Sequence, residues 1–377
     1  MMKVLLCTPY VGLSPANPGG IAIWARNIEN HYNSIDSDVE LEIFSMDRKH
    51  ESGDLTLIPR LWYGIKEYFP TVNRFRRHIK RHRYDAIHIC SSAQIGLIRD
   101  LLIVNIARKE HIPVVVHFHF GRMPELFEVR NWEYKLIRTV VKRASKTVVM
   151  DRKSLNTLTD HNYTNAVNLP NPLSDKILTQ IRTIQGGITV EREKRKLLYA
   201  GHVIPTKGVY ELIEACAQIP DIKLLVIGEY LEDIKNKLVD LAIAKSGNSN
   251  WLEFTGPVKH ERVIQEMMNS AIFVLPTYTE GFPNVILECM ASGCPIITTP
   301  VGAIPDMLQF GSTQACGACV DVKDVQGLKK TIEKQLNNYD SALLMAEKAK
   351  QRVIDNYSMP SVWKQLVSIW KMACNCT

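Results

Sequence analysis

"AIFVLPTYTEGFPNVILECMASGCPIITT" occupies residues 271–299 and predicts a strand, a loop, a helix and a second strand. The runs 271–277 and 294–299 are short, apolar and rich in β-branched residues, as buried strands are. Between them, Pro283 suits the start of a helix and Gly293 suits its end. Two strands joined through a helix run parallel, so this stretch predicts one unit of a parallel α/β sheet.

The same alternation of strands and helices extends along the whole chain. Further strands are expected at 3–10, 86–90, 112–120, 146–150, 196–201, 222–229 and 251–256. Helices are expected at 21–32, 71–83, 94–109, 132–144, 208–219, 231–246, 260–270, 284–292 and 326–337. The pattern predicts an α/β fold with two doubly wound, Rossmann-like domains facing a central cleft.

The chain length also indicates two domains, because 377 residues exceed one compact core of ordinary size. A turn signal at 168–173 and a polar stretch at 185–196 mark the linker between the domains. The expected boundaries are 1–172 for the first domain, 173–195 for the linker, 196–357 for the second domain and 358–377 for a C-terminal helix. That helix is amphipathic and is expected to cross back and pack on the first domain.

Composition excludes several classes of protein. No apolar run reaches the ~18 residues that cross a bilayer, and the N-terminus does not read as a signal peptide, so a cytoplasmic protein is expected. Nine cysteines do not form the even, regular set of a disulfide framework. Cys316 and Cys319 form a C-x-x-C without a second pair or nearby histidines, so we expect no metal or redox site there.

The positive charge is confined to the first half of the chain. Residues 1–172 hold 24 Lys and Arg against 17 Asp and Glu, whereas the remainder holds 22 of each. The helices at 69–83 and 131–144 carry much of this charge. The first has an apolar face of Val72, Phe75 and Ile79, and the second one of Trp132, Leu136 and Val140. They are either ordinary solvated helices or a surface that docks on anionic lipid. No nucleic-acid motif accompanies the charge, so nucleic acid is not an expected partner.

Residues 280–288 combine features that suit an anionic, polyhydroxylated ligand. The backbone amides between Gly281 and Val285 lie at a predicted helix N-terminus, which favours a phosphate. Glu280 precedes them and Glu288 lies within the helix, and carboxylates accept hydrogen bonds from paired sugar hydroxyls. The segment therefore suits a nucleotide sugar, which has a ribose, a diphosphate and a sugar in that order. The alternative is that Glu280 caps the helix and Glu288 is a solvated surface residue.

Other candidate residues follow further predicted strands. Lys207 and Gly208 open a helix after the strand at 196–201. A lysine at that position is able to neutralise the charge of a diphosphate leaving group. In the first half, Gly19 and Gly20 lie in the loop 14–28 and allow a close backbone approach to a ligand. Two histidines share one face of the strand at 112–120: His117 is interpreted as structural and His119 as a site residue, and the pair lacks a third metal ligand.

These motifs resemble those of the GT-B-fold retaining glycosyltransferases of family 4, over nearly the whole chain. The stretch 280–297, "EGFPNVILECMASGCPII", is similar to the family's E-x7-E signature, and 200–208, "AGHVIPTKG", is similar to its G-R-L-x-x-x-K-G segment. The stretch 169–173, "LPNPL", resembles its hinge, and 18–28, "PGGIAIWARNI", its N-terminal Gly-Gly loop. At the position of the family's usual arginine this chain has His202.

The resemblance implies a role for each matching residue. It implies that Glu288 holds the nucleotide ribose, that Lys207 binds the diphosphate and that His119 lies beside the reacting sugar. Glu280 would hold the donor sugar with the amides of Gly281 and Phe282. The donor-binding set that the resemblance implies also includes Pro283, Asn284, His202, Gly19 and Gly20.

The resemblance also implies the reaction. A glycosyl group would pass, with retained configuration and without a bound metal, from a nucleotide sugar to an acceptor hydroxyl. A UDP-sugar is favoured over a GDP-sugar, and the acceptor is expected to be a lipid-linked glycan or oligosaccharide of bacterial surface-polysaccharide assembly. A nucleotide-sugar epimerase of the same fold and a non-catalytic sugar-nucleotide binder are the alternatives.

Overall fold

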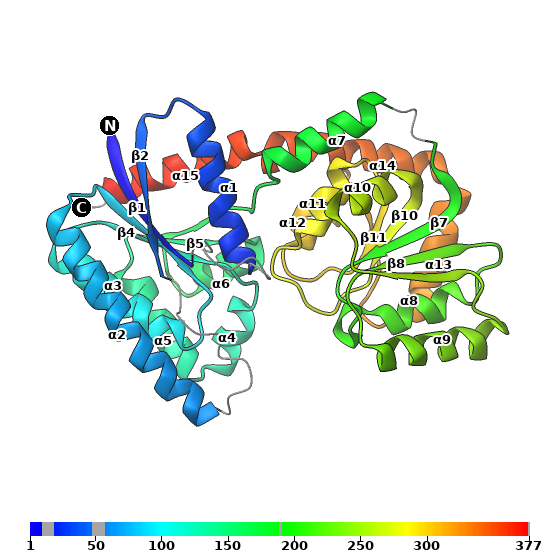
Figure 1. Ribbon diagram of the computed structural model, residues 1–377, viewed down its shortest axis with the longest axis horizontal. Helices are drawn as coiled ribbons and strands as arrows, with labels where there is room; N and C mark the ends of the chain where they lie inside the picture. The colour runs from blue at the N-terminus through cyan, green and yellow to red at the C-terminus, as the bar shows by residue number, and fades with distance from the viewer. Residues whose placement is uncertain (10–18, 47–56, 188–190, 376–377) are drawn as a thin grey trace. The chain divides into compact units, whose positions relative to one another are not determined.

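The computed structural model describes residues 1–9, 19–46, 57–187 and 191–375, with side chains except at 57–67 and 187. The chain divides into two compact units (Figure 1). The first unit contains Met1–Pro172 and Met359–Thr377, so the chain begins and ends in it, and the second contains Leu173–Ser358. Each unit is an α/β domain with its own sheet.

The first unit is built on a parallel six-stranded sheet in the order β2-β1-β3-β4-β5-β6. Its strands are β1 (Met2–Thr8), β2 (Val39–Ser45), β3 (Ala86–Ser91), β4 (Val114–Phe118), β5 (Lys146–Val149) and β6 (Ala166–Asn168). Its helices are α1 (Gly20–Ser34), α2 (Leu57–Arg81), α3 (Gly96–Lys109), α4 (Met123–Val129), α5 (Trp132–Arg143), α6 (Arg152–Asp160) and α15 (Met359–Cys374).

The second unit has a parallel six-stranded sheet of its own, in the order β12-β11-β10-β7-β8-β9. Its strands are β7 (Glu193–Ala200), β8 (Lys223–Ile227), β9 (Leu252–Gly256), β10 (Ser270–Leu275), β11 (Ile296–Thr298) and β12 (Ala318–Cys319). Its helices are α7 (Asp175–Gly187), α8 (Val209–Cys216), α9 (Glu232–Ser246), α10 (His260–Asn269), α11 (Asn284–Ala291), α12 (Ile304–Leu308), α13 (Val325–Asn337) and α14 (Tyr339–Arg352). Two short turns of helix complete it, η1 (Pro205–Lys207) and η2 (Val353–Tyr357).

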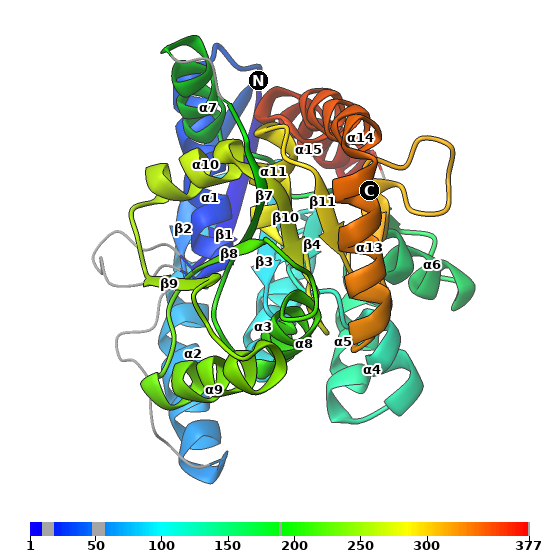
Figure 2. The ribbon, with the colours of Figure 1, turned by 90° about the vertical axis from the view of Figure 1, so that its right-hand side faces the viewer.

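Both sheets are covered on both faces, which is why their strands are apolar without alternation. In β1, Leu5 and Cys7 belong to a core packed under α2, α3 and α5, while Val4 and Leu6 belong to a second core under α1 and α15. In the second unit, α8 contacts both α9 and α13, and α7, α10, α11 and α14 form the other group (Figure 2). The predicted α/β fold with doubly wound sheets is confirmed.

The C-terminal helix α15 packs on the sheet of the first unit, as its amphipathic pattern predicts. Leu366 and Trp370 are fully buried in the core that α15 shares with α1. The Trp370 indole Nε1 donates a hydrogen bond to Nδ1 of His88 in β3, at 3.0 Å. Figure 1 shows α15, in red, along the first unit next to α1, in blue.

Several elements were not expected from the sequence. In β2, Glu40 and Glu42 interrupt the apolar pattern, because on this edge strand they face solvent, where Lys3 pairs with Glu40 at 2.6 Å. The segment 173–195, interpreted above as a linker, instead contains α7 and the start of β7 and belongs to the second unit. Helix α2 extends well before residue 71 and continues through Pro70.

On the basic helix α5, two of the expected apolar positions pack on the core and one does not: Val140 is buried and Leu136 packs against the core, but Trp132 is exposed. Trp132 is 53% exposed, whereas Ile137 and Val141 are fully buried. In the first turn the Asn131 side chain caps the helix, and Glu133 rather than Trp132 is turned inward, where it pairs with Arg122 at 2.6 Å. In α2 the expected apolar face of Val72, Phe75 and Ile79 is buried.

Arg192, just before β7, joins three elements of the second unit through its guanidinium group. Nη1 donates to the carbonyl oxygens of Met267 and Ser270, each at 2.9 Å. Nη2 donates to the carbonyl oxygens of Ser292 and Gly293, at 3.2 and 2.6 Å. Those last two carbonyls follow α11, where a cation is also favoured by the helix dipole. Arg192 therefore holds α11 against α10 and β10.

Replacing Arg192 with methionine should lower the stability of the second unit by about 1–3 kcal/mol, because partly buried carbonyl groups lose their donors. The measurement is urea unfolding, with hydrogen exchange of residues 284–293 as a local readout. The control is Lys194→Met, because Lys194 is an exposed basic residue of β7 only two positions after Arg192. Equal unfolding midpoints for Arg192→Met and Lys194→Met would contradict this role.

Candidate functional site

The loop between β10 and α11 presents the backbone amides that the sequence predicted. Helix α11 begins at Asn284, with Pro283 as its N-cap residue rather than its first residue, and no side chain caps it. The side chains of Phe282 and Pro283 are buried, whereas Asn284 is exposed. The first-turn amides of a helix have no partner within the helix, so this end of α11 favours an anion.

Lys207 and Glu280 form an ion pair across 73 residues of sequence. The Lys207 Nζ lies 2.5 Å from Oε1 of Glu280, and the two side chains are only 23% and 14% exposed. Glu280 therefore does not cap α11 but faces the cation that follows β7. The pair sets one ammonium group and one carboxylate next to the uncapped end of α11.

Close backbone packing fixes the positions of both residues. Gly208, after Lys207, has φ +72°, and a Cβ there would lie 2.0 Å from the carbonyl oxygen of Pro276. The amide of Tyr278 donates to the carbonyl oxygen of Thr206 at 2.9 Å, so the loops after β7 and β10 are joined.

A third loop, which follows β11, supports the loop that carries Glu280. Gly302 has φ +55°, and a Cβ there would lie 2.2 Å from the carbonyl oxygen of Glu280. The amide of Ala303 donates to the carbonyl oxygen of Gly281 at 2.9 Å. The contact leaves no room for a side chain at Gly302, so the loop after β11 packs directly against the backbone around Glu280.

Glu288 lies in α11 and has a different partner. Its Oε2 is 3.1 Å from Nε2 of His260, the first residue of α10, and its side chain is only 12% exposed. Glu288 is therefore not a solvated surface residue. The hydrogen bond to Glu288 raises the pKa of His260, against the opposing effect of burial and of Lys176.

The sequence analysis missed His260. It begins a helix 28 residues before Glu288, and no spacing rule relates the two positions. Lysine and histidine at 259–260 look like ordinary surface residues at a helix start. Only the packing of α10 beside α11 reveals the contact.

His202, also expected among the donor-binding residues, is exposed after β7. Its Nδ1 lies 3.8 Å from Oε2 of Glu229, and the two side chains are 68% and 69% exposed. Such an exposed pair contributes little to stability.

The first unit holds the remaining candidates, Gly19, Gly20 and His119. Gly19 is the N-cap residue of α1 and Gly20 its first residue, and a Cβ on either would meet nothing within 4 Å. Residues 14–18 of the predicted Gly-Gly loop lie outside the described residues.

His119 follows β4 in a cluster of aromatic rings. Its ring centroid lies 3.9 Å from that of His117 and 5.0 Å from that of Trp24. His88 joins the cluster, with its centroid 5.4 Å from that of His117. Burial lowers the pKa of His119 and of His88 to about 3, and it lowers that of His117 as well, so all three are neutral at pH 7. Neutral rings accept or donate hydrogen bonds but supply no charge.

Two models of protein families match the two parts of the chain. The model described as "Glycosyltransferase Family 4" matches residues 18–172, and the model described as "Glycosyl transferases group 1" matches residues 181–352. The chain belongs to the GT-B glycosyltransferases of the family 4 type.

Curated relatives and solved structures agree with this assignment. The capsular polysaccharide biosynthesis glycosyltransferase CapM of Staphylococcus aureus is 30% identical over 182 residues, 46% of this chain and 44% of CapM, so the match spans less than half of that relative. Sucrose-phosphate synthase from Thermosynechococcus elongatus has a TM-score of 0.72 at 17% identity, covering 100% of both chains. HepE of Anabaena, solved in complex with UDP, has a TM-score of 0.71 at 16% identity, covering 98% of this chain and 100% of HepE. At these identities the structural matches show the fold.

Two features are absent among the described residues. No group of three or more His, Cys, Asp or Glu side chains in the described ranges could hold a metal ion. The helices of these residues also lack the length and apolar content that a membrane-spanning helix needs.

The pKa of His260 should fall when Glu288 is replaced by glutamine, because the hydrogen bond to the carboxylate is the main cause of its increase. NMR titration of the His260 ring measures it. Since the folded-state pKa is raised, the pair stabilises the fold fully below about pH 6.5 and loses this contribution as pH rises through the folded pKa. Lys176→Met is the control and should shift the pKa upward. An unchanged pKa in Glu288→Gln would contradict the pairing.

Proposed function

We propose that the protein transfers a glycosyl group from a nucleoside diphosphate sugar to an acceptor hydroxyl. The observation that carries this proposal is the Lys207–Glu280 pair beside the uncapped N-terminus of α11, with the largely buried Glu288 in the same helix. A cation and helix amides suit a diphosphate, and the two carboxylates suit the hydroxyls of two sugars.

Bond cleavage would use the positive charges of this site. As the bond between the anomeric carbon and the diphosphate oxygen breaks, its electron pair moves onto the leaving phosphate, where Lys207 and the α11 amides stabilise it. The acceptor oxygen then bonds to the anomeric carbon, and its proton passes to the departing phosphate. The phosphate takes the proton, so no protein base is assigned to this step. Lys207 and the helix amides neutralise the diphosphate, so no metal is assigned either.

Retention of the anomeric configuration is supported by the resemblance of residues 280–297 to the E-x7-E signature. In this proposal His119 hydrogen-bonds the reacting sugar as a neutral ring. The configuration of the first product, read by NMR, tests the outcome, because an inverted anomer contradicts it.

A uridine nucleotide is the proposed donor. Solved structures of HepE, which shares this fold, hold UDP in one case and UDP-glucose in another. Glu288 would accept hydrogen bonds from the ribose hydroxyls in place of, or together with, His260. The proposal therefore places the nucleoside at α11 and the transferred sugar near Glu280.

UDP, rather than GDP or ADP, should raise the melting temperature of the protein in the presence of EDTA. A ligand at 100 times its dissociation constant adds about 2.7 kcal/mol of stability. Glu288→Gln and Lys207→Met should each weaken UDP binding by roughly 10–100-fold, because each removes a hydrogen bond involving a charged group. The measurement is thermal unfolding with titrated nucleotide.

The matched control for this experiment is Glu232→Gln on α9, where the glutamate side chain is 71% exposed. It should bind UDP as the unchanged protein does. If no nucleotide stabilises the protein, or if Glu288→Gln responds as the control does, the assignment of the site is wrong. A requirement for a divalent cation would contradict the metal-independent step.

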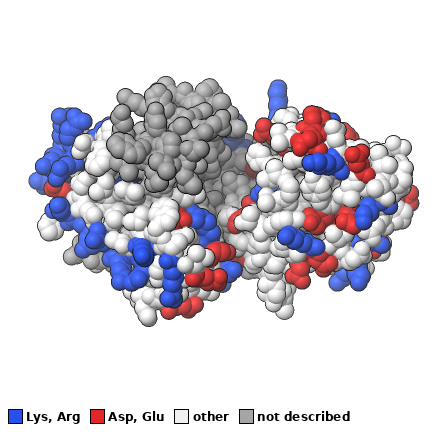
Figure 3. Space-filling model, turned by 90° about the horizontal axis from the view of Figure 1, so that it is seen from below, with Lys and Arg blue, Asp and Glu red and all other residues white. Residues whose placement is uncertain are grey.

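The proposed acceptor is a lipid-linked glycan in the assembly of a surface polysaccharide. The similarity to CapM, named for capsular polysaccharide biosynthesis, supports this acceptor class. A second support is the charge of the first unit, where Figure 3 shows many more Lys and Arg side chains than Asp and Glu on the visible face. Trp132, Lys135 and Lys142 follow one another on an exposed face of α5. A tryptophan beside basic residues suits the interface of an anionic membrane, so peripheral docking is part of the proposal.

The double variant Lys135→Ser/Lys142→Ser should bind vesicles containing anionic phosphatidylglycerol at least about tenfold more weakly, since each basic residue near the surface contributes about 1 kcal/mol. Trp132→Ala should weaken binding further by removing the interfacial ring. Co-sedimentation at low salt measures both effects. Lys237→Ser in the second unit, whose lysine is 67% exposed, is the control. Equal binding to neutral vesicles would exclude electrostatic docking.

A further inference from the structure

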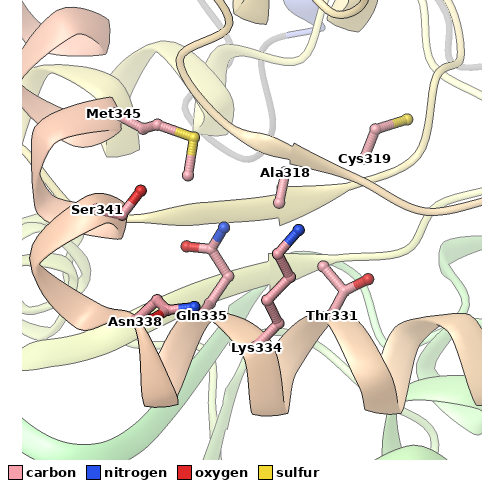
Figure 4. A pocket seen from close by; sticks show the side chains of 8 residues that line it. All are labelled: Ala318, Cys319, Thr331, Lys334, Gln335, Asn338, Ser341 and Met345. Carbon is pink, nitrogen blue, oxygen red and sulfur yellow. The ribbon is translucent and has the colours of Figure 1, made fainter.

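The second unit contains a pocket formed by residues outside the proposed donor site. It lies between β12, α13 and α14 and has a volume of about 420 Å³ (Figure 4). Pockets that bind small molecules measure about 300–1,000 Å³. The lining residues are Ala318, Cys319, Thr331, Lys334, Gln335, Asn338, Ser341 and Met345.

The lining has the chemistry of a site for a neutral or anionic polar ligand. It offers two amides, two hydroxyls and one ammonium group, together with the apolar side chains of Ala318 and Met345. No carboxylate lines it, although Glu333 and Asp340 are adjacent in sequence to lining residues. An anion could therefore enter without facing a carboxylate on the pocket wall.

Gln335 is a largely buried residue whose amide group faces this pocket. The residue is only 8% exposed, and within the described ranges its side chain has no recorded hydrogen-bond partner. Figure 4 shows its amide group turned from α13 toward the cavity. Because the amide faces the pocket, water or a polar ligand there can hydrogen-bond to it.

The N-terminus of α14 lies at the same pocket. This 14-residue helix has Asn338 as its N-cap residue, and the Asn338 side chain makes no capping hydrogen bond. Both Asn338 and Ser341, in the first turn, line the cavity. On the facing helix Lys334 extends its ammonium group into the cavity (Figure 4), and the part of the chain that the structure describes gives it no ion-pair partner. Uncapped amides and a nearby cation favour a phosphate group.

We propose that this pocket binds a small phosphorylated sugar. Its phosphate would lie at the N-terminus of α14 beside Lys334, and its ring hydroxyls would satisfy the Gln335 amide and the Thr331 hydroxyl. The apolar side chains of Ala318 and Met345 would contact the less polar face of the ring. The volume exceeds what a phosphate ion alone would fill, which is why a sugar phosphate is assigned.

The test is isothermal titration of the full chain with glucose 6-phosphate, inorganic phosphate and glucose. One saturable site is expected, with glucose 6-phosphate binding more tightly than either fragment. Lys334→Gln and Gln335→Leu should each weaken it at least about tenfold, because each removes a hydrogen bond to the ligand. Equal affinity for inorganic phosphate would overturn the sugar assignment, and no binding by the unchanged chain would overturn the proposal.

Variants of the proposed donor site separate the two proposals. Lys207→Met and Glu288→Gln should bind glucose 6-phosphate as the unchanged protein does, whether or not UDP binding succeeds. Loss of binding in Lys207→Met with retention in Lys334→Gln would assign the ligand to the other site and overturn the proposal. Unchanged melting temperatures of Lys334→Gln and Gln335→Leu without ligand establish that these variants fold.

Cys319 at the rim of the pocket provides a readout of location. Cys319 is exposed, whereas the other described cysteines are buried or partly buried. Bound glucose 6-phosphate should slow its alkylation by iodoacetamide, followed by mass spectrometry, and should do so less in Gln335→Leu. An alkylation rate unaffected by saturating ligand would contradict binding in this pocket.

Discussion

Two close approaches of backbone to backbone, at Gly208 and at Gly302, determine the geometry of the site in the second unit. In each case a Cβ would lie about 2 Å from a carbonyl oxygen, of Pro276 and of Glu280 respectively. The loops after β7 and β11 are thereby held against the loop after β10, which carries Glu280. Because parallel strands end at one edge of a sheet, three short loops meet there. A site assembled from backbone contacts of this kind keeps its charged groups in place without a ligand.

The charges at this edge are held in pairs. Glu280 contacts Lys207 and Glu288 contacts His260, so neither carboxylate is left unpaired at a largely buried position. Pairing offsets part of the cost of removing these groups from water. A ligand with hydroxyls and a diphosphate would provide alternative partners for the same four side chains. Binding would then exchange one set of charge-assisted hydrogen bonds for another, at little cost in conformational entropy.

The sequence predicted the elements that are apolar and periodic, and it missed contacts that depend on tertiary packing. Most central strands were expected within a few residues, because burial on both faces makes them continuous apolar runs. The edge strand β2 was missed because Glu40 faces solvent on it. Lys207 and Glu280 were each identified from strand–helix position, but their pairing joins residues far apart in sequence. No sequence pattern identified His260, and Trp132, expected on the buried face of its helix, is exposed while Glu133 beside it is buried.

The two units differ in the kind of polar group that lies near their strand ends. In the first unit, His88, His117 and His119 are buried together and uncharged at pH 7. Their ring nitrogens therefore offer hydrogen bonds to neutral groups such as hydroxyls, and they would neither attract nor repel a phosphate strongly. In the second unit, Lys207 is held as a cation beside a helix N-terminus. Electrostatics therefore favours a diphosphate at the site of the second unit and gives the neutral histidines of the first unit no such preference.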